Sequence, residues 1–216
     1  MNSFEKNIQS PFYQFMNFLY KIILVNLLYL FTNAVGFVFF TFAPATVAAM
    51  VCMKGIYEKK EFPIFSTFFH IFRSEYKKSM MLFLYYIILF ALLGGSFYYY
   101  YQSPDTLFNT IGLLVSGLLL FIHLTSFFHM LLISVYTPNI SFKAKIKYSY
   151  LMIVYSPVLS IMLFIVNLLV LLFSYVFLTF SFLFTFAFMW YYNIAISYRV
   201  YQNISKNYEP LDVLSH

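Results

Sequence analysis

Charged residues interrupt this chain only in short blocks, and long apolar intervals lie between the blocks. Four long stretches without a formal charge lie at residues 22–53, 79–101, 106–142 and 148–198. A helix needs about 20 mainly apolar residues to cross the hydrocarbon core of a bilayer. Each interval is long enough for at least one such helix. The pattern therefore predicts an all-α, polytopic transmembrane helical bundle.

Two of these intervals are too long to hold a single crossing. Residues 148–198 would form a helix of roughly 75 Å at about 1.5 Å per residue, so we expect a turn near residues 173–181. In the first interval Pro44 interrupts the apolar run, and proline is favoured at the start of a helix but not in its interior. We therefore expect one helix to end at about residue 41 and a short second helix to begin at Pro44.

The expected architecture is a single transmembrane domain over residues 1–216, with about six crossings and one amphipathic helix at the inner membrane surface. The helices are expected over about 18–41, 44–55, 63–78 (the surface helix), 80–101, 107–136, 150–173 and 177–199, followed by a carboxyl-terminal tail over 200–216. The second helix is short for a full crossing. A re-entrant segment, which leaves five crossings, is the alternative.

The positive-inside rule distinguishes these two topologies, because lysine and arginine gather on the cytoplasmic side. Six crossings place all 13 basic residues on one side, whereas five crossings leave Lys6 and Lys21 on the other. Six crossings are favoured, with both termini cytoplasmic in a bacterial-type plasma membrane. The one clear outer loop, residues 102–106, carries the acid Asp105.

Composition agrees with a lipid environment. Charged residues make up 9% of the chain and hydrophobic residues 62%, whereas a soluble domain carries roughly 25% charged residues. The net charge of +6 is explained by topology, so no nucleic-acid partner is expected. The single cysteine, Cys52, cannot form an intrachain disulfide.

The segment 63–78 has aromatic residues along one side of a helix and basic residues on the other. The aromatic stripe is Phe65, Phe68, Phe69, Phe72 and Tyr76, and the basic face includes Arg73, Lys77 and Lys78. We expect the aromatic face to enter the acyl chains and the basic face to meet anionic headgroups of the inner leaflet. The alternative, which can hold together with the first, is that the same aromatic ridge docks a cytoplasmic or membrane partner.

A later basic segment resembles this one. Shifted by 70 residues, Arg73 falls on Lys143, Lys77 on Lys147, Ser79 on Ser149 and Tyr85 on Tyr155. Two interpretations stay open. One is an internal repeat of a basic segment and a hairpin, as in transporters with parallel repeats. The other is chance identity within a narrow set of residue types.

Few polar side chains fall inside the predicted crossings. The candidates for intramembrane polar contacts are Asn26, Asn33, His123, His129 and Asn167. For the asparagines we expect hydrogen bonds between helices, and for the histidines a neutral ring bonded to a hydroxyl or carbonyl group. The two histidines lie about 120° apart around a helix, a poor geometry for a shared metal. A solute path lined by Asn26, Asn33 and His123 is the alternative.

Enzyme motifs are absent from the sequence. It has no His-Glu-x-x-His, no Gly-x-Ser-x-Gly, no phosphate loop and no pair of cysteines with zinc spacing. The predicted crossings contain neither paired carboxylates nor a nucleophile beside a base. We therefore expect a protein that is not an enzyme and that uses no cofactor or metal.

One stretch, residues 44–79, is distinctive. It contains Pro44-Ala45-Thr46, the basic turn 54–61, the run Phe62-Pro63-Ile64-Phe65-Ser66-Thr67-Phe68-Phe69 and Tyr76-Lys77-Lys78-Ser79. Together with Ser10-Pro11 and Ser156-Pro157, these features resemble the YesL-like family of bacterial membrane proteins, whose function is unknown. The resemblance extends over about residues 10–205. It implies a compact helical bundle and, because such proteins are associated with carbohydrate uptake and polysaccharide degradation, a supporting role in sugar acquisition.

Two functions follow as expectations. The first is a non-catalytic accessory or regulatory partner of a carbohydrate-uptake or membrane-sensing system, whose partner would be a sugar transporter permease or a sensor kinase. The second is a small transporter or channel for a small solute, working as a homo-oligomer. The resemblance supplies no functional residues to either.

Overall fold

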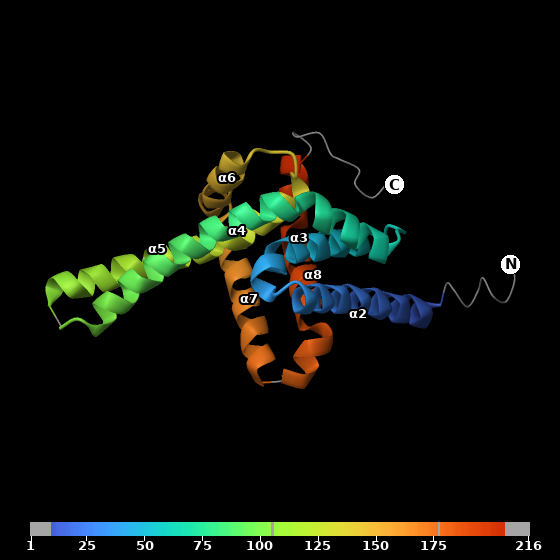
Figure 1. The fold of residues 1–216 in the computed structure, drawn as a ribbon, viewed down its shortest axis with the longest axis horizontal. Helices are drawn as coiled ribbons and strands as arrows, with labels where there is room; N and C mark the ends of the chain where they lie inside the picture. Colours follow the sequence, from blue (N-terminus) through green and yellow to red (C-terminus); the bar gives the residue numbers. More distant parts are fainter. Residues whose placement is uncertain (1–9, 105, 177, 206–216) are drawn as a thin grey trace, which may run out of the picture. The chain divides into compact units, whose positions relative to one another are not determined.

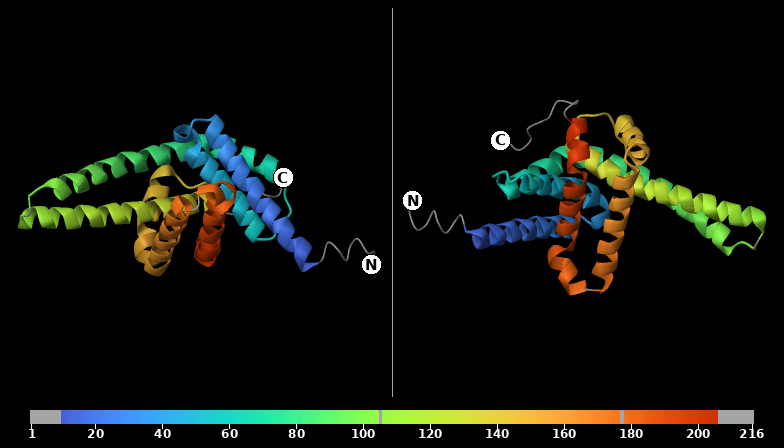
Figure 2. Two further views of the ribbon diagram at one scale, coloured as in Figure 1. Left: turned by 90° about the horizontal axis from the view of Figure 1, so that it is seen from below. Right: turned by 180° about the vertical axis from the view of Figure 1, so that it is seen from behind.

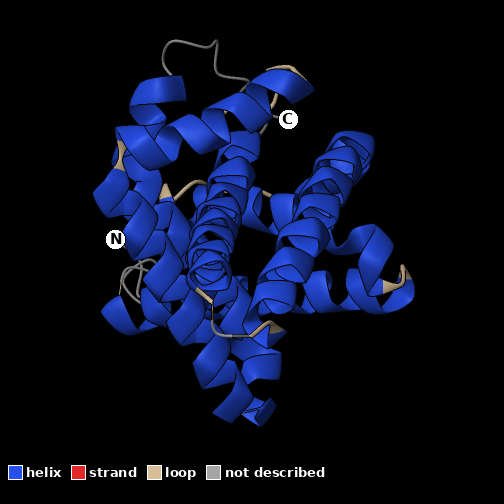
Figure 3. Cartoon of the chain, turned by 90° about the vertical axis from the view of Figure 1, so that its left-hand side faces the viewer, coloured by secondary structure: helices blue, strands red, loops and turns tan. Residues whose placement is uncertain are grey.

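The computed structural model describes residues 10–104, 106–176 and 178–205, and helices are the only regular elements among them (Figures 1 and 3). The helices are α2 (Pro11–Val35), α3 (Val38–Tyr57), α4 (Ile64–Gln102), α5 (Leu107–Tyr136), α6 (Phe142–Tyr155), α7 (Pro157–Val176) and α8 (Leu178–Ser205). By length and composition α2, α3, α4, α5 and α7 can each cross a membrane. The chain is thus an all-α, multi-pass membrane protein.

The start of α2 is set by a capping signal that hydropathy does not report. The Ser10 hydroxyl accepts a hydrogen bond from the backbone N–H of Tyr13 at 3.2 Å, and Pro11 occupies the first helical position. Serine is a preferred N-cap and proline is favoured directly after it. The first helix therefore begins at Pro11 rather than near residue 18.

The predicted break at Pro44 is wrong, because the chain turns at Gly36 and Phe37 instead. The Gly36 N–H bonds to the Thr32 carbonyl, and Phe37 adopts a positive φ of 51°. A Cβ on Gly36 would lie 2.1 Å from the Thr41 methyl carbon, so a larger residue does not fit there. Pro44 lies inside α3, which is consequently 20 residues long rather than about 12.

The predicted separation of a surface helix (63–78) from a crossing (80–101) is also wrong. Both segments belong to α4, an unbroken helix of 39 residues. Between Ile64 and Gln102 the sequence contains no proline, and the Gly94-Gly95 pair is accommodated within the helix. No residue here disrupts the backbone hydrogen bonds of the helix. The change from an amphipathic to an apolar sequence therefore does not end it.

Later in the chain the prediction for 107–136 is confirmed by α5, but the helix predicted over 150–173 is divided. α6 begins at Phe142, α7 begins at Pro157, and Ser156 between them has φ −135° and ψ 68°. Proline restricts the residue before it to non-helical conformations. The last predicted crossing, 177–199, falls on α8, which continues to Ser205. That crossing stays a prediction, and residue 177 of the predicted turn lies outside the described residues.

The chain packs as two compact units. The first combines the described residues up to Tyr76 with Val166–Ala195, and the second combines Lys77–Ile165 with the end of α8 from Ile196. In the first unit α2 and α3 lie side by side (Figure 1). Its core contains Trp190, whose ring centroid lies 4.4 Å from that of Tyr29. A single domain over residues 1–216 stays a prediction.

In the second unit α5 has two different halves. Every residue from His129 to Thr137 is buried, whereas much of 107–122 exposes apolar side chains. The exposed half lies beside the end of α4 as a hairpin (Figure 2), and a Cβ on Gly112 would lie 2.5 Å from the Tyr100 ring. In a membrane the exposed apolar side chains of this hairpin contact lipid.

Candidate functional site

His123 on α5 is buried, and both of its ring nitrogens are hydrogen-bonded within the second unit. Nε2 lies 2.9 Å from the backbone carbonyl oxygen of Tyr86, and Nδ1 lies 2.6 Å from the hydroxyl of Tyr150. A carbonyl oxygen only accepts, so Nε2 carries a proton and donates it. In the neutral ring Nδ1 then accepts from the Tyr150 hydroxyl, and these two bonds fix the tautomer.

His129, also buried on α5, repeats this arrangement with other partners. Its Nδ1 lies 2.6 Å from the Tyr201 hydroxyl on α8, and its Nε2 lies 2.7 Å from the Ser160 hydroxyl on α7. The Ser160 hydroxyl donates to the Ser156 carbonyl at 3.0 Å, so its oxygen accepts from Nε2. The same tautomer results, with a tyrosine donating to Nδ1.

Tyr86 extends the first of these clusters to α6. Its ring stacks on the His123 ring at a centroid distance of 4.9 Å, and its hydroxyl lies 2.6 Å from the Ser149 hydroxyl. Ser149 donates to the Ile146 carbonyl at 2.7 Å, so Tyr86 is the donor to Ser149. Through this cluster α4, α5 and α6 are connected by hydrogen bonds.

The buried asparagines of the first unit connect helices as well. Asn26 accepts at 3.1 Å from the backbone N–H of Ala187, and Asn33 accepts at 3.0 Å from the Thr41 hydroxyl across the α2–α3 turn. The Asn33 amide also donates to the Tyr29 carbonyl at 2.9 Å. The bonds to Ala187 and Thr41 join two helices, as the sequence leads us to expect for asparagine in a membrane, whereas the bond to Tyr29 lies within α2.

Asn167 forms a reciprocal pair with Asn193. Each side-chain amide donates to the other's carbonyl oxygen, at 3.0 Å and 3.1 Å, and both residues are buried. Asn193 was not among the predicted candidates. The sequence does contain a signal that could have identified Asn193, because Asn167 and Asn193 are the only asparagines in the apolar interval 148–198.

The predicted histidines and asparagines are therefore hydrogen-bonded to neighbouring groups of the protein in the described structure. Asn26 and Asn33 belong to the first unit and His123 to the second. The histidines bond to hydroxyl and carbonyl groups, and no group of three His, Cys, Asp or Glu side chains able to hold a metal occurs within the described ranges. The tyrosine partners of the histidines had no distinguishing signal among 21 tyrosines.

The amino-terminal part of α4 presents a different kind of surface. Phe65 is 63% exposed and Tyr76 is partly exposed, whereas Phe69 and Phe72 are half-buried. Phe68 is fully buried, so the expectation that it faces acyl chains is wrong. The buried side of this segment is Ile64, Thr67, Phe68, Ile71 and Glu75. Arg73, Lys77 and Lys78 are exposed, as a basic outer face requires.

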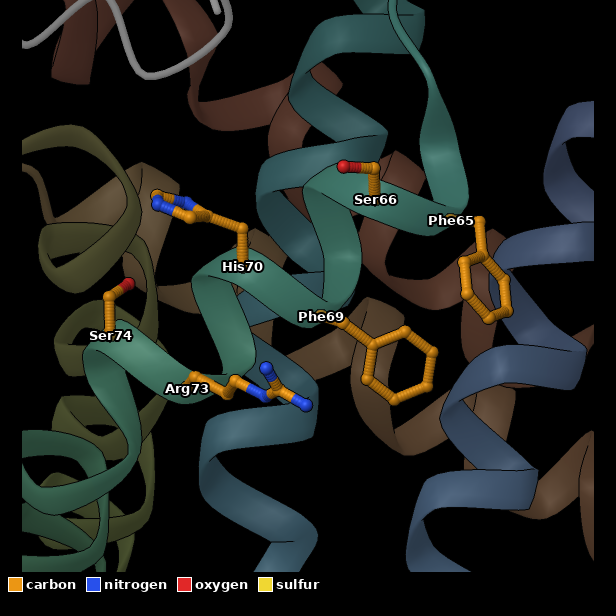
Figure 4. A pocket seen from close by; sticks show the side chains of 6 residues that line it. All are labelled: Phe65, Ser66, Phe69, His70, Arg73 and Ser74. Carbon is orange, nitrogen blue, oxygen red and sulfur yellow. The ribbon is translucent and has the colours of Figure 1, made fainter.

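An open hollow of about 870 Å³ lies on this exposed side of α4 (Figure 4). Its lining consists of Phe65, Ser66, Phe69, His70, Arg73 and Ser74. Ser74 donates to the Ile71 carbonyl at 3.1 Å. The outward side chains of Ser66, His70 and Arg73 make no hydrogen bond or ion pair with another described residue.

One family model matches the chain. It is described as "Protein of unknown function, DUF624" and covers residues 22–97. No curated protein and no solved structure matches. YesL-like proteins are members of DUF624, and the match includes the distinctive stretch 44–79. The resemblance is thereby confirmed over residues 22–97, where the chain is similar to the DUF624 family of proteins of unknown function.

Proposed function

We propose that this protein is a non-catalytic component of a bacterial plasma membrane and acts as an accessory or regulatory partner of a carbohydrate-uptake or membrane-sensing system. The observation that carries the proposal is the use of its intramembrane polar groups. Asn26, Asn33, His123, His129 and Asn167 are all buried and all hydrogen-bonded to neighbouring helices or backbone. Such groups hold helices together rather than offering ligands to a solute.

The exposed part of α4 supports a partner role. Exposed basic side chains at Arg73, Lys77 and Lys78 lie on the same helix as the exposed ring of Phe65, a combination suited to anionic lipid and to a membrane-protein partner. We place this face and both termini on the cytoplasmic side, because that topology gathers the basic residues there. The carbohydrate connection comes from the YesL-like resemblance, and the partner we expect is a sugar permease or a sensor kinase.

Affinity capture of the full chain from native membranes tests the proposal. We expect a sugar permease or a sensor kinase to be enriched with the wild-type chain and with Lys147→Glu, an exposed change on α6. The double change Arg73→Glu and Lys77→Glu should reduce that enrichment. Preparations that contain neither class of partner would contradict an accessory role.

A flux measurement addresses the alternative function. The purified chain is reconstituted into vesicles, and uptake of labelled monosaccharides is compared with that of variants Asn33→Leu and His123→Phe. We expect no flux above that of protein-free vesicles. Flux that disappears in these two variants would establish the transporter alternative and overturn our proposal.

A further inference from the structure

The exposed side of α4, near its amino-terminal end, carries polar side chains that make no hydrogen bond to another described residue. Ser66, His70 and Arg73 follow one another at intervals of four and three residues, so their side chains lie on neighbouring turns of one helix face. All three are exposed; in Figure 4 Ser66 and His70 project to one side of the α4 ribbon, and Arg73 extends toward the side on which the Phe69 ring lies. Their hydrogen-bonding groups are therefore available to a ligand.

The charge at this hollow is positive. None of its six lining residues is acidic, and Arg73 supplies a permanent cation. The acids of the preceding loop are engaged elsewhere, Glu61 with Lys21 at 3.3 Å and Glu58 with Lys60 at 3.1 Å. Glu75, next to Ser74 in sequence, is buried on the other side of the helix. An anion is the complementary ligand.

Aromatic rings border the polar groups. The Phe65 and Phe69 ring centroids are 4.9 Å apart, and both residues line the hollow. Figure 4 shows these two rings together at one side of it. An inorganic phosphate or another small soluble anion makes no use of such rings. An anion joined to hydrocarbon places its charge at Arg73 and its apolar part against the rings.

We propose that this hollow binds the headgroup of one anionic glycerophospholipid. The Arg73 guanidinium and a His70 ring N–H donate to the phosphate oxygens, which are the acceptors that arginine suits best. The Ser66 hydroxyl donates to the headgroup, and the Ser74 oxygen, whose proton is directed to the Ile71 carbonyl, accepts from a headgroup hydroxyl. Phe65 and Phe69 contact the upper acyl chain. This proposal does not depend on the accessory role.

Binding is measured with the full chain in phosphatidylcholine nanodiscs that contain a small fraction of fluorescent phosphatidylglycerol. We expect Arg73→Gln to weaken binding about tenfold, since the variant loses a charge-assisted hydrogen-bond donor. The matched control is Lys77→Gln, which removes the same charge one turn further along α4 and outside the hollow. It should weaken binding less than about twofold, the change expected for loss of a solvated surface charge.

Two further comparisons separate the lipid from other ligands. Phe69→Ala should weaken binding of phosphatidylglycerol, and glycerol phosphate without acyl chains should compete only weakly. Equal losses in Arg73→Gln and Lys77→Gln would show diffuse attraction rather than a site. Glycerol phosphate that competes as well as the lipid would show a soluble anion site, and unchanged binding in Arg73→Gln would also overturn the proposal. Monodispersity and helix content of each variant confirm folding, and Arg73→Lys should restore part of the affinity.

Discussion

Helix α4 runs unbroken through the point at which its later counterpart divides. Under the 70-residue shift, Tyr86 and Ile87 of α4 correspond to Ser156 and Pro157, where α6 ends and α7 begins. Ser156 has left the helical conformation, with φ −135° and ψ 68°. A single proline accounts for the difference, because it lacks an N–H group and constrains the residue before it.

The two regions agree in a different property, the register of their buried residues. In α4 the buried positions include Glu75, Ser79 and Leu82, and in α6 the buried positions are Lys145, Ser149 and Met152. Each triplet has intervals of four and three residues, and the triplets coincide under the same shift. The comparison teaches that burial pattern and helix continuity vary independently. It supports the internal repeat, which stays a prediction.

The largest expected effect tests which positions of α6 are buried. Lys145 is 1% exposed, although it lies between the exposed residues Lys143 and Lys147. Lys145→Glu reverses a buried charge and should lower the free energy of unfolding by about 3–5 kcal/mol. Lys147→Glu, the control, should change it by less than about 0.5 kcal/mol. Unfolding in mixed micelles of dodecyl maltoside and dodecyl sulfate measures both, and similar values would refute the register.

A proline transplanted into α4 tests the cause of the break. Ile87→Pro should cost about 3 kcal/mol, because it removes a backbone hydrogen bond to the Phe83 carbonyl and displaces Tyr86 from the helix. The His123 bond to the Tyr86 carbonyl, at 2.9 Å, should also weaken. The same unfolding measurement is made with Ile87→Ala as control. A variant as stable as this control would show that proline alone does not decide where these helices divide.

The smallest effect concerns the bond that joins the two regions. Tyr86→Phe removes the donor to Ser149 and should cost about 0.6 kcal/mol, with an upper limit of about 1.7 kcal/mol. Tyr155→Phe is the control, because Tyr155 is 76% exposed and makes no hydrogen bond with a described residue. If both changes cost the same, the Tyr86–Ser149 contact at 2.6 Å contributes nothing measurable.

Hydropathy predicts the class of this fold well because lipid imposes a length and a composition on every crossing. α5 has the predicted boundaries, α3 and α4 each contain a predicted apolar segment, and α2 and α7 each contain part of one. The predicted boundaries are wrong where local backbone chemistry decides where a helix begins or ends. α2 ends at Gly36, where the turn into α3 leaves no room for a side chain, and the buried Pro44 lies inside α3 rather than at its start.

The polar groups illustrate a second limit of the sequence. An asparagine or histidine in an apolar interval is conspicuous, so Asn26, Asn33, His123, His129 and Asn167 could be singled out. Their partners are backbone groups, serines and tyrosines, which are common in this chain and carry no positional signal. Phe68 shows the same limit, since periodicity groups it with Phe65 and Phe69 but cannot show which neighbours cover it.

The contact between Asn26 and Ala187 has a consequence for how related sequences would vary. Asn26 is bound by a main-chain N–H, not by the methyl group of Ala187. Every residue except proline supplies that donor, so exchanges at position 187 are restricted by size alone, whereas position 26 must keep a hydrogen-bond acceptor. Correlated substitutions between the two positions should therefore be absent, and methods that infer proximity from covariation would overlook one of the ties between α2 and α8.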